Sequence, residues 1–154
     1  MEEICMENEA KEFFLFFARF EYALKNSGYV SADRYGNAKP DWNKFKKDVS
    51  EVDNFIDKND VDIRALREEP PRTQCYCSSE LKWKDRPSIS YNIVELIDAC
   101  HTIRNNLFHG GKNNNRDLRR NLMLLRATRK ILEATLEAKS DVKIKFDEAF
   151  LSIK

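Results

Sequence analysis

The chain has 154 residues, and its 27 Lys and Arg against 26 Asp and Glu leave a formal net charge of +1. This length fits a single domain over residues 1–154, and a composition of 42% hydrophobic and 34% charged residues is typical of a soluble globular protein and not of a disordered one. The longest unbroken apolar stretch has six residues, which excludes a membrane span, and the first dozen residues are acidic, unlike a secretory signal. We therefore expect a cytoplasmic protein with no membrane partner.

Apolar residues recur at spacings of three and four, and only four glycines and four prolines interrupt them, which predicts an all-α fold. We expect a bundle of four to five helices: residues 8–26, residues 41–57, a helix between Pro87 and Gly110, residues 116–139 and a short helix in the tail around Phe146. Residues 58–87 contain Pro70-Pro71 and are expected to wrap the surface as irregular structure, with only a short helical possibility near Ile63.

Each expected long helix carries an apolar seam that should face the core. The seam residues are Phe13, Phe17, Phe20 and Leu24, then Trp42, Phe45, Val49, Val52 and Phe55, then Ile93, Leu96, Cys100, Ile103 and Leu107, then Leu118, Leu122, Leu125, Leu132 and Leu136. The phenylalanines of the first helix are interpreted as core or dimer surface, not as a platform for nucleic-acid bases.

Positive charge is concentrated in residues 104–130, which carry eight cations and one anion, a net charge of +7. Arg119, Arg126 and Lys130 are spaced by seven and four residues, so they form a stripe along one side of a helix. Together with Lys112 and Arg116, this stripe is a candidate site for binding the phosphate backbone of RNA. The plainer alternative is a solvated helix face.

The segment from Arg104 to His109 places an arginine and a histidine, separated by four residues, at the end of an amphipathic helix. Asn105 and Asn106 are poor helix formers, which indicates that their amides are wanted for hydrogen bonding. Two glycines follow His109, so its ring can turn toward the opening that Arg104 faces, although five residues of continuous helix would set the pair about 140° apart. The alternative is a surface arginine and a histidine that helps to end the helix.

This segment resembles the R-x-x-x-x-H motif of the HEPN superfamily, small all-α proteins that include metal-independent RNases of toxin–antitoxin, abortive-infection and CRISPR-type defence systems. Asn105 fits the resemblance, because the family typically has Asn, Asp or His after the arginine. Residues 13–28, 69–72 and 104–112 are together similar to a plasmid- and island-borne HEPN subgroup, so the resemblance covers most of the chain.

The resemblance implies an endoribonuclease of toxin or anti-phage defence that uses no metal and no cofactor and cleaves RNA through its own 2′-OH. His109 would serve as base or acid, because histidine titrates near neutral pH. Arg104 would fork onto two phosphate oxygens of the transition state, and Asn105 would hold the phosphate or orient His109. HEPN RNases pair as symmetric homodimers whose two motifs meet, which implies an obligatory homodimer here.

The resemblance also implies RNA as a partner and an antitoxin or other regulatory protein. In one branch of the family the toxin carries a tyrosine two residues past the histidine, where this chain has Gly111, which argues against a nucleotidyltransferase antitoxin of that type. The alternative function is a catalytically inactive HEPN module that binds nucleic acid or a partner protein. A purely structural helical dimer is a third alternative.

Several further residues are candidate parts of a site. Glu21 is a candidate for holding Arg104 in place, with an ordinary pair to Lys25 as the alternative, and Asn106 is a second candidate for a supporting role. His101 is expected to be a partly buried, hydrogen-bonded histidine and not a catalytic one.

The four cysteines are Cys5, Cys75, Cys77 and Cys100. They are expected to be free thiols, because Cys75-Tyr76-Cys77 with Cys100 and His101 is only a weak zinc pattern. Gly110-Gly111-Lys112 follows a helix and lacks the first glycine of a P-loop, so we expect no nucleotide there.

Overall fold

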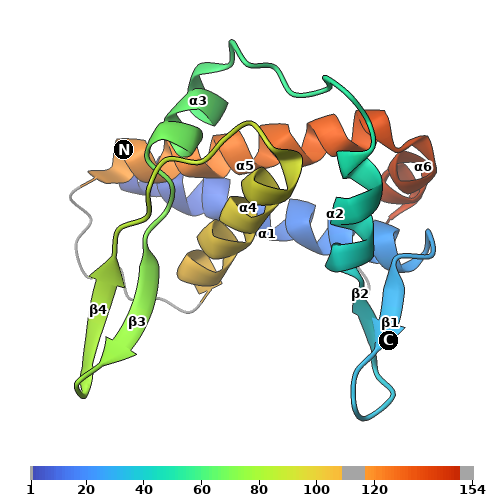
Figure 1. Ribbon diagram of the computed structural model, residues 1–154, viewed down its shortest axis with the longest axis horizontal. Helices are drawn as coiled ribbons and strands as arrows, with labels where there is room; N and C mark the ends of the chain where they lie inside the picture. The colour runs from blue at the N-terminus through green and yellow to red at the C-terminus, as the bar shows by residue number, and fades with distance from the viewer. Residues whose placement is uncertain (1, 109–116, 150–154) are drawn as a thin grey trace.

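The structure is a computed structural model that describes residues 2–108 and 117–149 of the chain (Figure 1). Helices dominate it, because the apolar repeats run for long stretches without glycine or proline. The elements in chain order are α1 (Glu2–Lys25), β1 (Val30–Ala32), β2 (Ala38–Pro40), α2 (Trp42–Ser50), α3 (Val61–Glu68), β3 (Thr73–Cys77), β4 (Glu80–Lys84), α4 (Ile93–Phe108), α5 (Leu118–Ala138) and α6 (Ser140–Glu148).

The prediction of an all-α fold is wrong. The described residues form six helices, more than the four to five expected, and also two antiparallel two-stranded sheets, so the fold is mixed α/β. Each sheet is a hairpin of neighbouring strands, β1 with β2 and β3 with β4. Both hairpins project from the helices in the same general direction (Figure 1).

The segment 58–87, expected to be irregular apart from a possible short helix from Ile63 to Glu68, contains that helix as α3 and also the β3–β4 hairpin. Helix α3 is capped by Asp60, whose carboxylate accepts hydrogen bonds from the backbone N–H groups of Asp62 and Ile63 at 2.9 and 3.1 Å. The hairpin turns at Ser78 and Ser79, whose φ angles of 50° and 62° are the left-handed pair that a two-residue turn requires. Sequence reasoning missed this turn because serine lacks the strong turn signal of Asn-Gly.

The first hairpin occupies a stretch for which no strand was predicted. The carboxylate of Asp33 closes its turn by accepting hydrogen bonds from the backbone N–H groups of Tyr35 and Asn37 at 2.8 and 2.9 Å, and Gly36 takes a φ of 84°. Helix α2 follows directly and ends at Ser50, well before the expected end at residue 57. Asn54 has a φ of 55°, which a continuous helix does not allow.

The hydrophobic core is built around α1, which packs against α5 and α6 and is crossed by α4 (Figure 1). The predicted seam of this helix is confirmed, since Phe13, Phe17, Phe20 and Leu24 are all buried. The ring of Phe20 stacks on that of Trp42 with centroids 5.3 Å apart. All six helices contribute buried side chains to this one core, which fixes the ends of α4 and α5 relative to α1.

The seams of the later helices are confirmed in their middle parts. The buried members are Phe45, Val49, Ile93, Leu96, Cys100, Ile103, Leu125, Leu132 and Leu136. Leu118 and Leu122, near the start of α5, are only partly buried, and Val52 is exposed because α2 has already ended.

Candidate functional site

Helix α4 carries the predicted catalytic residues Arg104 and Asn105 near its carboxyl end. The buried stripe of this helix ends at Ile103, so the next two side chains emerge at the edge of the core. His109, the third predicted catalytic residue, lies outside the described residues, and so do Lys112 and Arg116 of the predicted RNA-binding set.

The guanidinium group of Arg104 lies between two aromatic rings and two polar side chains. Its central carbon is 5.0 Å from the ring centroid of Phe108 and 5.5 Å from that of Phe17. Its Nη1 donates a hydrogen bond to Asn105 Oδ1 at 3.1 Å, and its Nη2 is 4.0 Å from Glu21 Oε1. The side chain remains 33% exposed, so part of its hydrogen-bonding edge faces solvent.

Glu21 comes from α1 and is itself held in place. Trp42 Nε1 donates a hydrogen bond to Glu21 Oε2 at 2.9 Å, which leaves the other carboxylate oxygen toward Arg104. Within the described part of the chain, the ion pair of Glu21 is with Arg104 and not with Lys25, the alternative partner. The role of Trp42 in this arrangement was not predicted, because its position on the apolar seam of the second helix indicates only core packing.

The two asparagines after Arg104 do different things. Asn105 is exposed and accepts the hydrogen bond from Arg104. Asn106 points the other way, and its Nδ2 donates to the backbone carbonyl of Arg72 at 2.8 Å. Asn106 therefore anchors the segment that leads into β3, and this contact is a structural support and not a contact to Arg104.

His101 packs inside the site. Its ring meets the Trp42 ring edge-on with centroids 4.4 Å apart, and a second edge contact goes to Phe17 at 6.1 Å. Burial, followed by the positive charge of Lys46, lowers the pKa of His101 to about 4. The imidazole is therefore neutral at physiological pH and contributes to packing, although the hydrogen bond expected for it is missing at Nε2 within the described residues.

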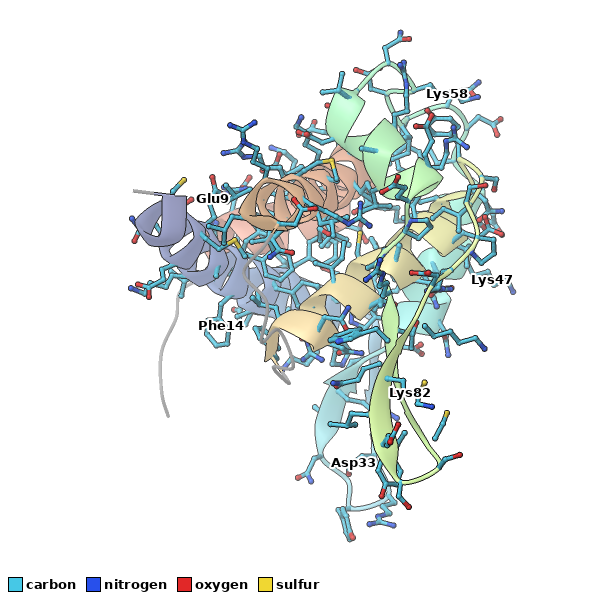
Figure 2. The ribbon with its side chains drawn as sticks, turned by 90° about the vertical axis from the view of Figure 1, so that its left-hand side faces the viewer. Glu9, Phe14, Asp33, Lys47, Lys58 and Lys82 are labelled. Carbon is cyan, nitrogen blue, oxygen red and sulfur yellow. The ribbon has the colours of Figure 1, made fainter. Side chains whose placement is uncertain are left out.

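An exposed aromatic pair borders Arg104. Phe14 of α1 and Phe108 of α4 are 51% and 39% exposed, and their rings meet edge-on with centroids 5.5 Å apart. Figure 2 shows Phe14 on the outer side of α1, pointing away from the core. Leu15 and Tyr22 of α1 are also exposed. Phe14 was recognisable in the sequence as a phenylalanine outside the buried seam of its helix.

The predicted RNA-binding stripe of α5 is largely occupied by acidic partners. Arg126 Nη2 is 3.4 Å from Glu9 Oε1, and Lys130 Nζ is 2.7 and 2.9 Å from carboxylate oxygens of Asp62 and Asp60. Hydrogen bonds to Asp62 and Asp60 raise the pKa of Lys130. These two cations join α5 to α1 and α3, so a phosphate backbone would have to compete with the carboxylates that they already pair with.

Arg119 is the remaining described cation of the stripe. It is exposed and makes no ion pair within the described residues, but it lines a groove together with Glu68, Glu69 and Asp117. Acidic side chains thus surround this position too, which weakens the prediction that the stripe as a whole binds a polyanion.

The cysteines are free in the structure. Cys75 and Cys77 lie on one face of β3 with their sulfur atoms 3.5 Å apart, while Cys100 is buried in α4, where burial raises the pKa of its thiol to about 12. No three His, Cys, Asp or Glu side chains converge as a metal site in the ranges 2–108 and 117–149. Across the same ranges, no helix is long and apolar enough to cross a membrane.

Comparisons of the chain with protein-family models, with curated proteins and with solved structures give no match. The resemblance to HEPN proteins therefore depends on the residues of the chain itself.

Proposed function

We propose that this protein is a metal-independent endoribonuclease of the HEPN type, in which Arg104, Asn105 and His109 act on RNA in toxin or anti-phage defence. The observation that supports it most is the placement of Arg104: its guanidinium is held by Glu21, Asn105 and two aromatic rings, yet a third of the side chain remains exposed. Because these neighbours already hold the guanidinium group in one orientation, it can bind a phosphate without a change in its conformation.

The chemistry follows from what these side chains can do. The 2′-OH of one nucleotide attacks the adjacent phosphorus, the bond to the 5′-oxygen of the next nucleotide breaks, and a 2′,3′-cyclic phosphate remains. Arg104 stabilises the charge on the nonbridging oxygens, and Asn105 adds an amide donor. His109 exchanges the proton with the attacking or the leaving oxygen. We assign His101 no part, because its Nε2 is buried and its ring packs against Trp42 and Phe17.

One chain supplies a single Arg104 and a single His109, whereas the reaction needs a base and an acid together. We therefore include a homodimer in the proposal, with both motifs at one composite site. The exposed rings of Phe14 and Phe108 support this, because they place apolar surface beside Arg104 that a second copy would cover.

A catalytically inactive binding module is the second candidate. The pairing of Arg126 and Lys130 with carboxylates favours it, since an RNase with few free cations must gain its affinity for RNA elsewhere. The exposed apolar residues beside Arg104 would then contact a partner protein, such as an antitoxin or another regulator.

Cleavage of labelled single-stranded RNA in EDTA tests the proposal. The wild type should cut RNA but not the 2′-O-methyl form, and its products should end in 2′,3′-cyclic phosphate. Arg104→Ala and His109→Ala should each lose about 100-fold or more of the rate, while Arg126→Ala, an exposed arginine outside the site, should cut normally. A wild type that binds RNA without cutting it would favour the inactive module.

A further inference from the structure

The β3–β4 hairpin has one largely apolar face with exposed aromatic side chains. Tyr76 pairs with Leu81 across the strands and Gln74 with Trp83, so these four side chains share a face. Tyr76 is 72% exposed, Leu81 69% and Trp83 37%. Figure 1 shows the hairpin projecting from the helices as an arm.

The arm is positively charged. Residues 72–86 contain four cations and two anions, a net charge of +2. Arg72 pairs with Asp85 at 2.7 Å and Lys82 with Glu80, so Lys84 and Arg86 are the cations of the arm that make no ion pair within the described residues. Lys82 and Lys84 occupy the opposite face of the ribbon, with Lys82 3.6 Å from Glu80 and half exposed (Figure 2). Exposed aromatic rings on a ribbon flanked by lysines are the combination with which proteins hold single-stranded nucleic acid: bases stack on the rings and cations attract the phosphates.

The root of the arm is fixed to the end of α4, on a different side of the helix from Arg104, since side chains two residues apart on a helix point about 200° apart. The hydrogen bond from Asn106 to the Arg72 carbonyl ties the segment before β3 to α4, two residues after Arg104. From the start of α5, Arg120 Nη2 donates to the carbonyls of Glu69 and Pro70 at 2.7 and 3.4 Å. Both contacts hold the arm at the end of the bundle that carries the candidate active site.

We propose that the β3–β4 arm binds single-stranded RNA by stacking unpaired bases on Tyr76 and Trp83. These residues are diagonal neighbours across the strands, about 7–8 Å apart, so one extended strand can meet both rings. Base-paired RNA is excluded as the preferred ligand, because its bases offer no free faces along the duplex. Delivery of the strand to Arg104 rests on the proposed function, whereas binding to the arm does not.

Binding of a fluorescein-labelled single-stranded DNA, about 16 nucleotides long, tests the arm separately from cleavage, since DNA has no 2′-OH. Tyr76→Ala and Trp83→Ala should each weaken binding at least about fivefold, while Tyr76→Phe and Trp83→Phe should bind as the wild type does. The matched control is Tyr35→Ala: Tyr35 is 73% exposed, but it lies at the tip of the other hairpin. A duplex of the same sequence should bind more weakly than the single strand.

Equal affinity for Tyr76→Ala, Trp83→Ala and Tyr35→Ala would overturn the proposal. If instead the first two variants change the oligomeric state in light scattering while their affinity for the oligonucleotide stays that of the wild type, the aromatic face is a contact with a second copy, and the proposal is wrong. If the RNase proposal alone is wrong, the wild type will bind the DNA oligonucleotide through Tyr76 and Trp83 but will not cleave RNA.

Discussion

The end of α4 and the outer face of α5 both carry cations, but the two regions use them differently. Lys130 has two carboxylates within 2.9 Å and Arg126 has one at 3.4 Å, so these side chains hold α5 to its neighbours. Arg104 has its carboxylate at 4.0 Å and is otherwise held by an amide and two rings. The comparison teaches that partners, and not the net charge of a segment, decide which cation is available to a ligand.

The largest expected effect is on the pH dependence of folding stability and comes from His101, which packs against the residues that hold Arg104. Its pKa is about 4 when folded and about 6.5 when unfolded, so the unfolded chain binds the extra proton as the pH falls below 6.5. Stability is then lost down to about pH 4. When the pH falls from about 7 to about 4.5, the free energy of unfolding of the wild type should decrease by about 2–3 kcal/mol more than that of His101→Phe. Urea unfolding at both pH values measures this, and equal losses would contradict a buried neutral His101.

A smaller effect is expected from removing the carboxylate that holds Arg104. Glu21→Gln can still accept the hydrogen bond from Trp42 but loses its charge, so kcat should fall about tenfold while the unfolding midpoint stays unchanged. Glu9→Gln is the matched control, since Glu9 is also on α1, has a similar exposure, 29% against 24%, and pairs with Arg126. If both variants lose the same activity, Glu21 has no special role at the site.

The smallest effect is expected on the outer face of α5. Lys130→Met leaves Asp60 and Asp62 facing each other and should cost about 1 kcal/mol of unfolding free energy without changing RNA cleavage. Lys143→Met is the control, because Lys143 has the same exposure but its partners Glu137 and Asp147 are largely exposed, so its loss should cost less. A fall in cleavage by Lys130→Met would assign this face to RNA after all.

The sequence predicts the long helices well and the strands poorly. The seam of Phe13, Phe17, Phe20 and Leu24 shows the helical period over several turns, and all four residues are buried. The β3–β4 hairpin has only five residues in each strand and a turn of two serines. The prolines before it suggested a loop, although the alternation in Glu80–Lys84 was a strand signal.

Some contacts of the site could likewise be predicted from the sequence, and others could not. The sequence predicts two alternative partners for Glu21, Arg104 and Lys25, because Glu21 lies on the same stripe as Phe14, and the structure has the pair with Arg104. The contact of Lys130 with Asp62 joins residues 68 positions apart, and only the packing of α3 on α5 brings them together. Periodicity places a residue on a face of a helix but does not say which charges lie opposite.

Single-turnover cleavage of one labelled RNA by Arg104→Lys and Arg126→Lys tests the central claim most directly. Both variants keep the positive charge and remove only the fork of the guanidinium group. If the end of α4 is the reaction site, Arg104→Lys should be slower by about 100-fold, while Arg126→Lys should stay within about threefold of the wild type. Equal rates for the two variants, or a greater loss for Arg126→Lys, would contradict the assignment of catalysis to Arg104.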